Sequence, residues 1–511
     1  MTDTMFAFFC KFSQPEELQR ARLAFRVLSL LVLFALPTVA QKNPPKQTAQ
    51  ENLTYIVEYS TARMGRVHIV IVPSRPLKGP VTLVIPRAIP SGYAQQFYDR
   101  YVVDVKATSE AGNALKTERE DGPRWRVGSA DAVAKIEYDV DLARHEGEIT
   151  AAADTSKARP KYVGLLGYSV FGYLEGSDNK PIRLEVSGPE GWPVFTTLAP
   201  KAIADQTKTA GEAANFYALA DSQVAMGPML EIRRLEAPLP LFLIMYAEVD
   251  TDLSRHSEIF ADAFRKVLAY FGDAPFIHYT GYIEILKPVS ERHEYGFSME
   301  HVNSSTYFLG VDRAINSKTT SQQIERERYN FAHHVSHSWI PKQVYGTGYL
   351  PFTWELAPQI DTIWFNEGFA RHITIEALAD SMSETEGREF RRRQFEGLRR
   401  LVATMPEFIR SMSLLELSRV ASLMYSSDFR TGRTLFAKGA LMAEEMDQLI
   451  RTRTNQKKRL RDSFQALVKW GEQSGRAFRL EELPGLIAKP VGVNERGIKE
   501  ILERWIAAGK N

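Results

Sequence analysis

The hydrophobic pattern of this chain changes once along its length, and the change limits the folds that it can adopt. Over residues 53–235, apolar and polar residues alternate in short runs between Pro and Gly turns, for example at 67–72, 81–85 and 133–140. A period of two is typical of half-buried strands. After about Pro240 the spacing becomes helical, with one apolar face made of Ile259, Phe260, Phe264, Val267, Leu268 and Phe271. The pattern predicts a β-sandwich of short antiparallel strands, followed by a part that is mostly helical from about residue 400.

Composition indicates a globular protein of several domains. The chain has 511 residues, of which 44% are hydrophobic and 25% are charged. Its 64 basic and 62 acidic residues give a formal charge of +2, and no dense Lys/Arg run provides the surface that nucleic-acid binding needs, so we expect no nucleic-acid partner. The single cysteine, Cys10, lies in a segment that we expect to be removed. The mature protein would then have no thiol for catalysis, metal binding or disulfides.

Residues 1–40 have the pattern of a secretory signal peptide. Basic residues precede the apolar run 27–36, which is followed by Pro37 and by small residues up to Ala40. These are the basic region, apolar core and cleavage site of a signal peptide, and a polar linker follows at 41–52. We therefore expect a secreted or periplasmic protein. An uncleaved N-terminal anchor is the alternative, and no later segment is apolar enough to span a bilayer.

A pair of histidines at helical spacing is the first sign of chemistry. Residues four apart share one helix face, so His333 and His337 can present two imidazole nitrogens to one Zn²⁺, and Pro341 would end that helix. The pair alone is weak support, because a chain of this composition shows such a spacing by chance about 0.2 times. Glu367 is the natural third ligand, which leaves a fourth zinc position open. The structural alternatives are a polar helix face with unpaired histidines and a surface glutamate.

Further segments occur in an order that is known from one family. The histidine pair is followed by Trp339, by Pro351-Phe352-Thr353-Trp354 and by Ile363-Trp364-Phe365-Asn366-Glu367-Gly368. Upstream lie Tyr270-Phe271-Gly272-Asp273-Ala274-Pro275-Phe276, Tyr295-Gly296-Phe297-Ser298-Met299-Glu300-His301, and the segments 85–93 and 173–176. Together these segments resemble the glycyl aminopeptidase family of zinc peptidases, which is metallopeptidase family sixty-one and of the gluzincin type. That family carries a His-Glu-x-x-His helix, a Pro-Phe-Asp-Tyr segment and a Leu-Trp-x-x-Glu-Gly segment.

The resemblance covers residues from about 53 to about 470 and implies a multidomain α+β protein. It implies an N-terminal β-sandwich domain at 53–238, a thermolysin-like gluzincin catalytic domain at 239–400 and a C-terminal helical domain at 401–511. We expect no PDZ domain of the kind that is often appended in this family.

The resemblance also implies a role for each matching site residue. It makes His333, His337 and Glu367 the ligands of one zinc ion per chain, and Glu300 the group that holds the free α-amino group of a substrate. A carboxylate near the metal can pair with an ammonium group in this way, so peptides or protein N-termini are the implied partners. A structural hydrogen bond or salt bridge near His301 is the alternative role of Glu300.

Three departures from the family pattern concern the chemistry itself. His334 stands where the family has its general-base glutamate, whose proton transfer is worth roughly 10²- to 10⁴-fold in rate. Phe436 stands where the family has a tyrosine that stabilises the tetrahedral oxyanion, and losing one such donor costs roughly 10²- to 10³-fold. Ile340 replaces an asparagine. The three losses favour a degenerate peptidase, although His334, with a reference pKa of roughly 6.5, is itself a base suited to neutral pH.

Three functions remain open from the sequence, and they leave undecided whether the chain is an enzyme. The first is an exported, zinc-binding pseudoenzyme with weak or no peptidase activity. The second is an active zinc aminopeptidase that removes small N-terminal residues with His334 as an unusual base. The third is a metal-free binding or structural module in which the histidines line a cleft.

Overall fold

The computed structural model describes residues 52–506 except 91, 94, 130, 202–205, 294, 351 and 426. The predicted signal peptide, its cleavage site and Cys10 lie outside the described residues. Among the described residues, no helix is both long enough and apolar enough to cross a membrane.

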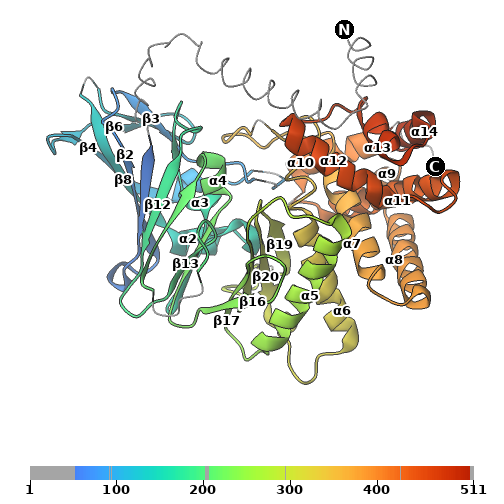
Figure 1. Cartoon of the computed structure of the whole chain (residues 1–511). Coiled ribbons are helices and arrows are strands. Elements are labelled where there is room, and N and C mark those ends of the chain that lie inside the picture. The colour runs from blue at the N-terminus through green and yellow to red at the C-terminus, as the bar shows by residue number, and fades with distance from the viewer. Residues whose placement is uncertain are drawn as a thin grey trace, which may run out of the picture. The chain divides into compact units, whose positions relative to one another are not determined.

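The N-terminal part is a β-sheet domain, as the alternating pattern predicts, and its strands form three sheets (Figure 1). The largest sheet has the strand order β14-β12-β1-β2-β8-β4-β5. Its strands are β1 (Leu53–Glu58), β2 (Arg66–Pro73), β4 (Val102–Ser109), β5 (Ala114–Leu115), β8 (Val133–Asp141), β12 (Ile182–Ser187) and β14 (Lys208–Ala213). Every second residue of β1 is buried. One pairing departs from the expected antiparallel arrangement, because β1 and β12 are parallel. Two parallel strands need a long connection between them, and here the connection contains most of the other strands of the domain.

Two four-stranded sheets complete this part. One contains β11 (Tyr173–Leu174), β3 (Val81–Val84), β7 (Arg124–Val127) and β6 (Thr117–Arg119); the other contains β13 (Val194–Thr196), β15 (Gln223–Met226), β10 (Tyr162–Leu166) and β9 (Lys157–Arg159). Short helical segments connect them: η1 (Thr61–Arg63), η2 (Tyr98–Tyr101), α2 (Leu142–Glu148), η3 (Ala152–Asp154), α3 (Gly167–Val170) and α4 (Phe216–Ala220).

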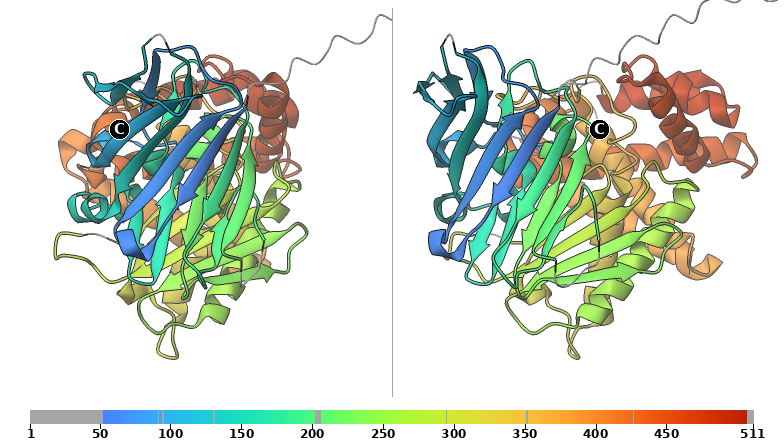
Figure 2. Two further views of the ribbon diagram at one scale, coloured as in Figure 1. Left: turned by 90° about the vertical axis from the view of Figure 1, so that its left-hand side faces the viewer. Right: turned by 60° about the vertical axis from the view of Figure 1, so that its left-hand side comes forward.

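The middle part is a five-stranded mixed sheet covered by two long helices (Figure 2). Its order is β16 (Glu231–Leu235), β17 (Leu241–Ala247), β18 (Tyr279–Leu286), β20 (Ser304–Gly310) and β19 (Phe297–Glu300), and β17, β18 and β20 run parallel. The 3₁₀ turn η4 (Val311–Arg313) follows β20. Because β16 pairs with β17, residues 231–235 belong to the middle sheet, although the sequence analysis placed them in the N-terminal domain.

Helix α5 (Leu253–Phe271) has the apolar face that its spacing predicts. Its side chains Ile259, Phe260, Phe264 and Val267 are fully or almost fully buried. The neighbouring helix is α6 (Ser321–Ser336), and just beyond it the ring of Trp339 stacks on Phe271 with centroids 4.7 Å apart. This contact fixes the end of the segment that carries the histidine pair.

The last part is helical, in agreement with the sequence. It contains the π-helical turn η5 (Trp364–Phe369) and the helices α7 (Ala370–Ala379), α8 (Glu384–Thr404), α9 (Glu407–Arg410), α10 (Leu414–Met424), α11 (Phe429–Arg453), α12 (Leu460–Ser474), α13 (Leu483–Val491) and α14 (Glu495–Ile506). Helix α8 continues across residue 400, where the sequence analysis set a domain boundary.

Two glycines bring η5 against α11. A Cβ atom on Gly368 would lie 2.5 Å from the Cα of Gly439, and a Cβ on Gly439 would lie 2.5 Å from the carbonyl oxygen of Trp364. Any larger residue at either position would therefore force the two segments apart. Since Gly368 follows Glu367 directly, this close packing sets the position of the predicted third ligand.

Candidate metal centre

The last turn of α6 brings the two predicted histidine ligands together. The helix begins with a capping box formed by Thr320 and Gln323. It ends at Ser336, and its C-cap residue is His337. The helix therefore ends before Pro341 is reached. The Nε2 atoms of His333 and His337 are 3.3 Å apart, and both side chains are buried.

Glu367 completes a group of three from the π-helical turn η5. Its Oε2 atom lies 3.5 Å from Nε2 of His333 and 3.5 Å from Nε2 of His337. Ligands bound tetrahedrally at zinc's usual bond lengths lie about 3.3 Å from one another. The two imidazoles and the carboxylate therefore match the donor set and the spacing of a zinc site, and π-helical turns such as η5 often occur at functional sites.

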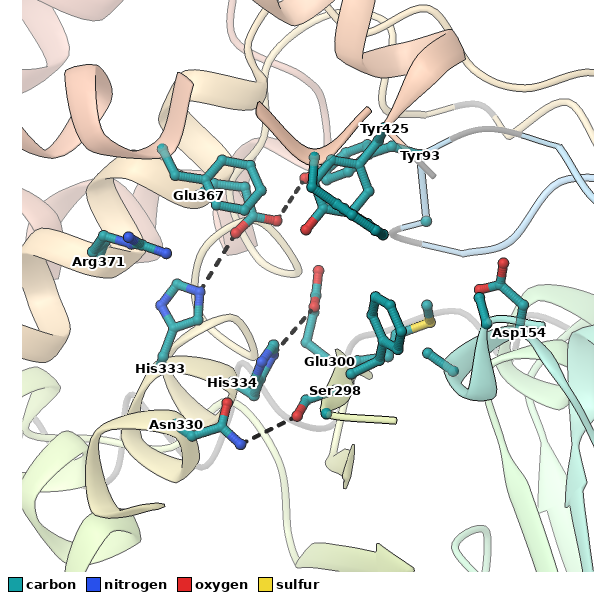
Figure 3. A pocket seen from close by; sticks show the side chains of 18 of the residues that line it. Tyr93, Asp154, Ser298, Glu300, Asn330, His333, His334, Glu367, Arg371 and Tyr425 are labelled. Carbon is teal, nitrogen blue, oxygen red and sulfur yellow. Dashed lines mark hydrogen bonds and ion pairs between the residues drawn. The ribbon is translucent and has the colours of Figure 1, made fainter. Parts of the chain in front are cut away.

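Tyr93 holds the carboxylate of Glu367 from the N-terminal part of the chain. Its hydroxyl donates a hydrogen bond to Oε1 of Glu367 at 3.0 Å (Figure 3). The segment that precedes Tyr93 is tied in turn to Trp354, because the backbone N–H groups of Arg87 and Ala88 both donate to the Trp354 carbonyl. The sequence analysis did not assign a site role to Tyr93, although its segment 85–93 was part of the family resemblance.

Burial and charge favour deprotonated ligands at two of the three positions. Burial lowers the pKa of His333 to about 3. Burial opposes ionisation of Glu367, but the neighbouring His337 and His333 hold the pKa of this carboxyl well below its usual range. Burial also lowers the pKa of His337, yet the carboxylates of Glu300 and Glu367 outweigh it and raise that pKa to about 9.

His334 and Glu300 lie next to each other beside this group. The Nδ1 atom of His334 is 3.8 Å from Oε2 of Glu300, at the end of β19. Glu300, His334 and His337 form a second group whose ligand atoms all lie within 4.8 Å of one another. The neighbours His333 and His334 thus fall into different groups that share His337, as expected for consecutive residues of a helix.

The other oxygen of Glu300 faces the site without a partner. Glu300 is 4% exposed, and its Oε1 atom is buried and accepts no hydrogen bond from the described residues. The carboxylate of Glu300 is therefore available to a ligand of the site.

A cavity of about 360 Å³ opens onto these side chains. Phe436 lines it, together with Tyr425, which the sequence analysis did not single out. The ring of Tyr425 stacks on Phe436 with centroids 5.7 Å apart and meets Tyr93 edge-on at 5.8 Å. Burial and the charges of Glu367 and Glu300 raise the pKa of the Tyr425 phenol, so this hydroxyl remains a donor at neutral pH. Further lining residues that only the structure identifies are Arg313, Arg326, Asn330 and Arg371.

Comparison with known proteins agrees with this architecture. Residues 54–228 match the Peptidase M61 N-terminal domain. No curated protein matches the sequence.

Several solved zinc metallopeptidases and related proteins have a similar fold. An aminopeptidase N family protein from Idiomarina loihiensis is 18% identical, with a TM-score of 0.77 over 90% of this chain and 76% of that one. The M1 zinc metallopeptidase from Deinococcus radiodurans is 13% identical, with a TM-score of 0.51 over 89% of this chain and 93% of that one. A mutant of that enzyme bound to a Tyr-Ser-Ala substrate is 13% identical, with a TM-score of 0.50 over 90% and 94% of the two chains. The N-terminal part thus matches a domain known from M61 peptidases, and the overall fold is similar to that of M1 aminopeptidases.

Proposed function

We propose that this chain is an exported zinc-binding protein of the metallopeptidase fold that binds peptide N-termini and hydrolyses them slowly or not at all. The observation that carries the proposal is the meeting of His333, His337 and Glu367 at the spacing of a zinc site, with the imidazole of His334 in place of a general-base carboxylate. Export rests on the signal pattern of residues 1–40 alone.

The site residues suit a peptide whose amino group is free. A bound zinc ion would polarise the carbonyl group of such a peptide and lower the pKa of a water molecule at its open position. The unpartnered Oε1 of Glu300 offers a charge-assisted hydrogen bond to the ligand's ammonium group. Since a fold relative has been solved with a tripeptide substrate, peptides are the natural ligand class.

The same residues argue for weak hydrolysis. Burial lowers the pKa of His334, so its imidazole is neutral at pH 7 and a weaker base than in water. Replacing the general base lowers the rate roughly 10²- to 10⁴-fold. The absence of a hydroxyl on Phe436 lowers it by a further factor of roughly 10² to 10³.

An active aminopeptidase with His334 as its base is the second candidate, and two observations favour it. Oε2 of Glu300 lies 3.8 Å from Nδ1 of His334, so a shift of about 1 Å would let the carboxylate orient the imidazole by a hydrogen bond, as carboxylates do in catalytic triads. Tyr425 stacks on Phe436 and lines the cavity, so its hydroxyl can replace the missing oxyanion donor. A metal-free binding or structural module is the third candidate.

Two measurements separate these candidates. Elemental analysis of protein purified without chelators should give about one zinc per chain, lost in His333→Ala; no zinc in the parent protein would leave only the metal-free candidate. Hydrolysis of Gly and Ala amides should be slow or absent in the parent and should rise in His334→Glu. Rapid hydrolysis by the parent that falls in His334→Glu would instead establish the unusual base.

A further inference from the structure

Three of the described arginines line the cavity, and one of them makes no hydrogen bond or ion pair with another described residue. Nη2 of Arg313 donates to Glu327 at 2.6 Å, and Nε of Arg326 lies 3.4 Å from the same carboxylate. Arg371 makes no hydrogen bond or ion pair with any residue that the structure describes, and its Nε atom is buried. The side chain as a whole is half-buried and lines the cavity, so its terminal N–H groups can reach an anion there.

Arg371 lies directly beside the metal centre. It sits on α7 four residues after Glu367, and its guanidinium carbon is 5.7 Å from the ring centre of Phe436. That contact engages the face of the guanidinium group, so the N–H groups of the two terminal nitrogens remain available at its edge. In the view of Figure 3, the guanidinium group points toward His333 and Glu367, which lie between it and Glu300.

We propose that Arg371 binds a carboxylate of the peptide ligand whose amino group Glu300 holds. The inference rests on the proposed peptide-binding function and adds a ligand class to it. The planar fork of an arginine matches a carboxylate through two parallel hydrogen bonds, which a lysine cannot make. The carboxylate has two sources: the C-terminus of a dipeptide, or the acidic side chain of a residue that follows the N-terminus.

The test compares three small peptides that differ in one charge. The zinc-loaded chain is titrated calorimetrically with Gly-Gly, Gly-Gly amide and Gly-Asp amide. At least one of the two carboxylate-bearing peptides should bind about tenfold to a hundredfold more tightly than Gly-Gly amide, and the tighter one identifies the source of the carboxylate. In Arg371→Gln this preference should disappear while the affinity for Gly-Gly amide stays unchanged. Arg326→Gln is the matched control, because that arginine also lines the cavity but lies beside Glu327, and it should keep the preference.

The other outcomes overturn the inference in distinguishable ways. Equal binding of all three peptides by the parent refutes the role of Arg371 and leaves the proposed peptide binding intact. An equal loss for all three in Arg371→Gln means that Arg371 only maintains the shape of the cavity. If the zinc-loaded parent binds none of the peptides, the proposed function fails together with the inference.

Discussion

Replacing Tyr93 by phenylalanine should weaken zinc binding although Tyr93 is not itself a ligand. The change removes only the hydroxyl that donates to Oε1 of Glu367 at 3.0 Å. Hydrogen bonds to charged groups contribute about 1.5 to 3 kcal/mol, and removal of a group that orients a metal ligand typically costs about 10- to 100-fold in metal affinity. These two ranges agree, because tenfold corresponds to about 1.4 kcal/mol. We therefore expect the zinc dissociation constant of Tyr93→Phe to rise about 10- to 100-fold.

The assay is competition with a chromogenic zinc chelator at fixed pH. Tyr425→Phe is the matched control: it removes a hydroxyl from a neighbouring ring that also lines the cavity, yet that ring makes no hydrogen bond to Glu367 among the described contacts. Its zinc affinity should stay within about twofold of the parent's, by the same reasoning. If Tyr93→Phe keeps the parent's affinity while both proteins remain folded, the hydrogen bond does not position the ligand, and the metal centre is independent of the N-terminal domain.

Three further changes test the packing, the acid stability and the chemistry. Gly439→Ala should lower the thermal midpoint, because a Cβ there would lie 2.5 Å from the carbonyl oxygen of Trp364 and overpacking costs about 1 to 3 kcal/mol; Gly397→Ala, whose Cβ would meet open space, should be neutral or stabilising. Burial lowers the pKa of His145 to about 3, so the folded state binds fewer protons than the unfolded state and stability falls as the pH drops below about 6.5. Between pH 7 and pH 5 the free energy of unfolding should fall by about 2 kcal/mol because of this histidine. Urea unfolding should show a decline smaller by that amount in His145→Phe. The double variant His334→Glu/Phe436→Tyr should hydrolyse amides roughly 10²- to 10³-fold faster than His334→Glu alone. If the added hydroxyl gives no increase at any pH, residue 436 does not contact the reacting group.

Local pattern was sufficient to predict the elements that bury one face. The alternating runs became strands β2, β3 and β8, and the apolar spacing that includes Phe264 became the buried face of α5. Such predictions succeed because buried residues recur along the sequence with the period of the helix or strand that carries them. Pairing between distant strands leaves no comparable repeat, so the parallel pair of β1 with β12 and the joining of β16 to the middle sheet were not foreseen.

The sequence by itself determined which residues have the chemistry to bind a metal and where the chain departs from the family pattern that it resembles. The spacing of His333 and His337, the glutamate in a later segment and the imidazole at position 334 are visible in the printed residues. Only the tertiary structure decided that the three candidate ligands meet at a common spacing, that Tyr93 reaches Glu367 across 274 residues and that Arg371 faces the same cavity unpaired. Their meeting depends on the packing of η5 against α11 and on the hydrogen bonds of Arg87 and Ala88 to Trp354, which join segments that are remote in the chain.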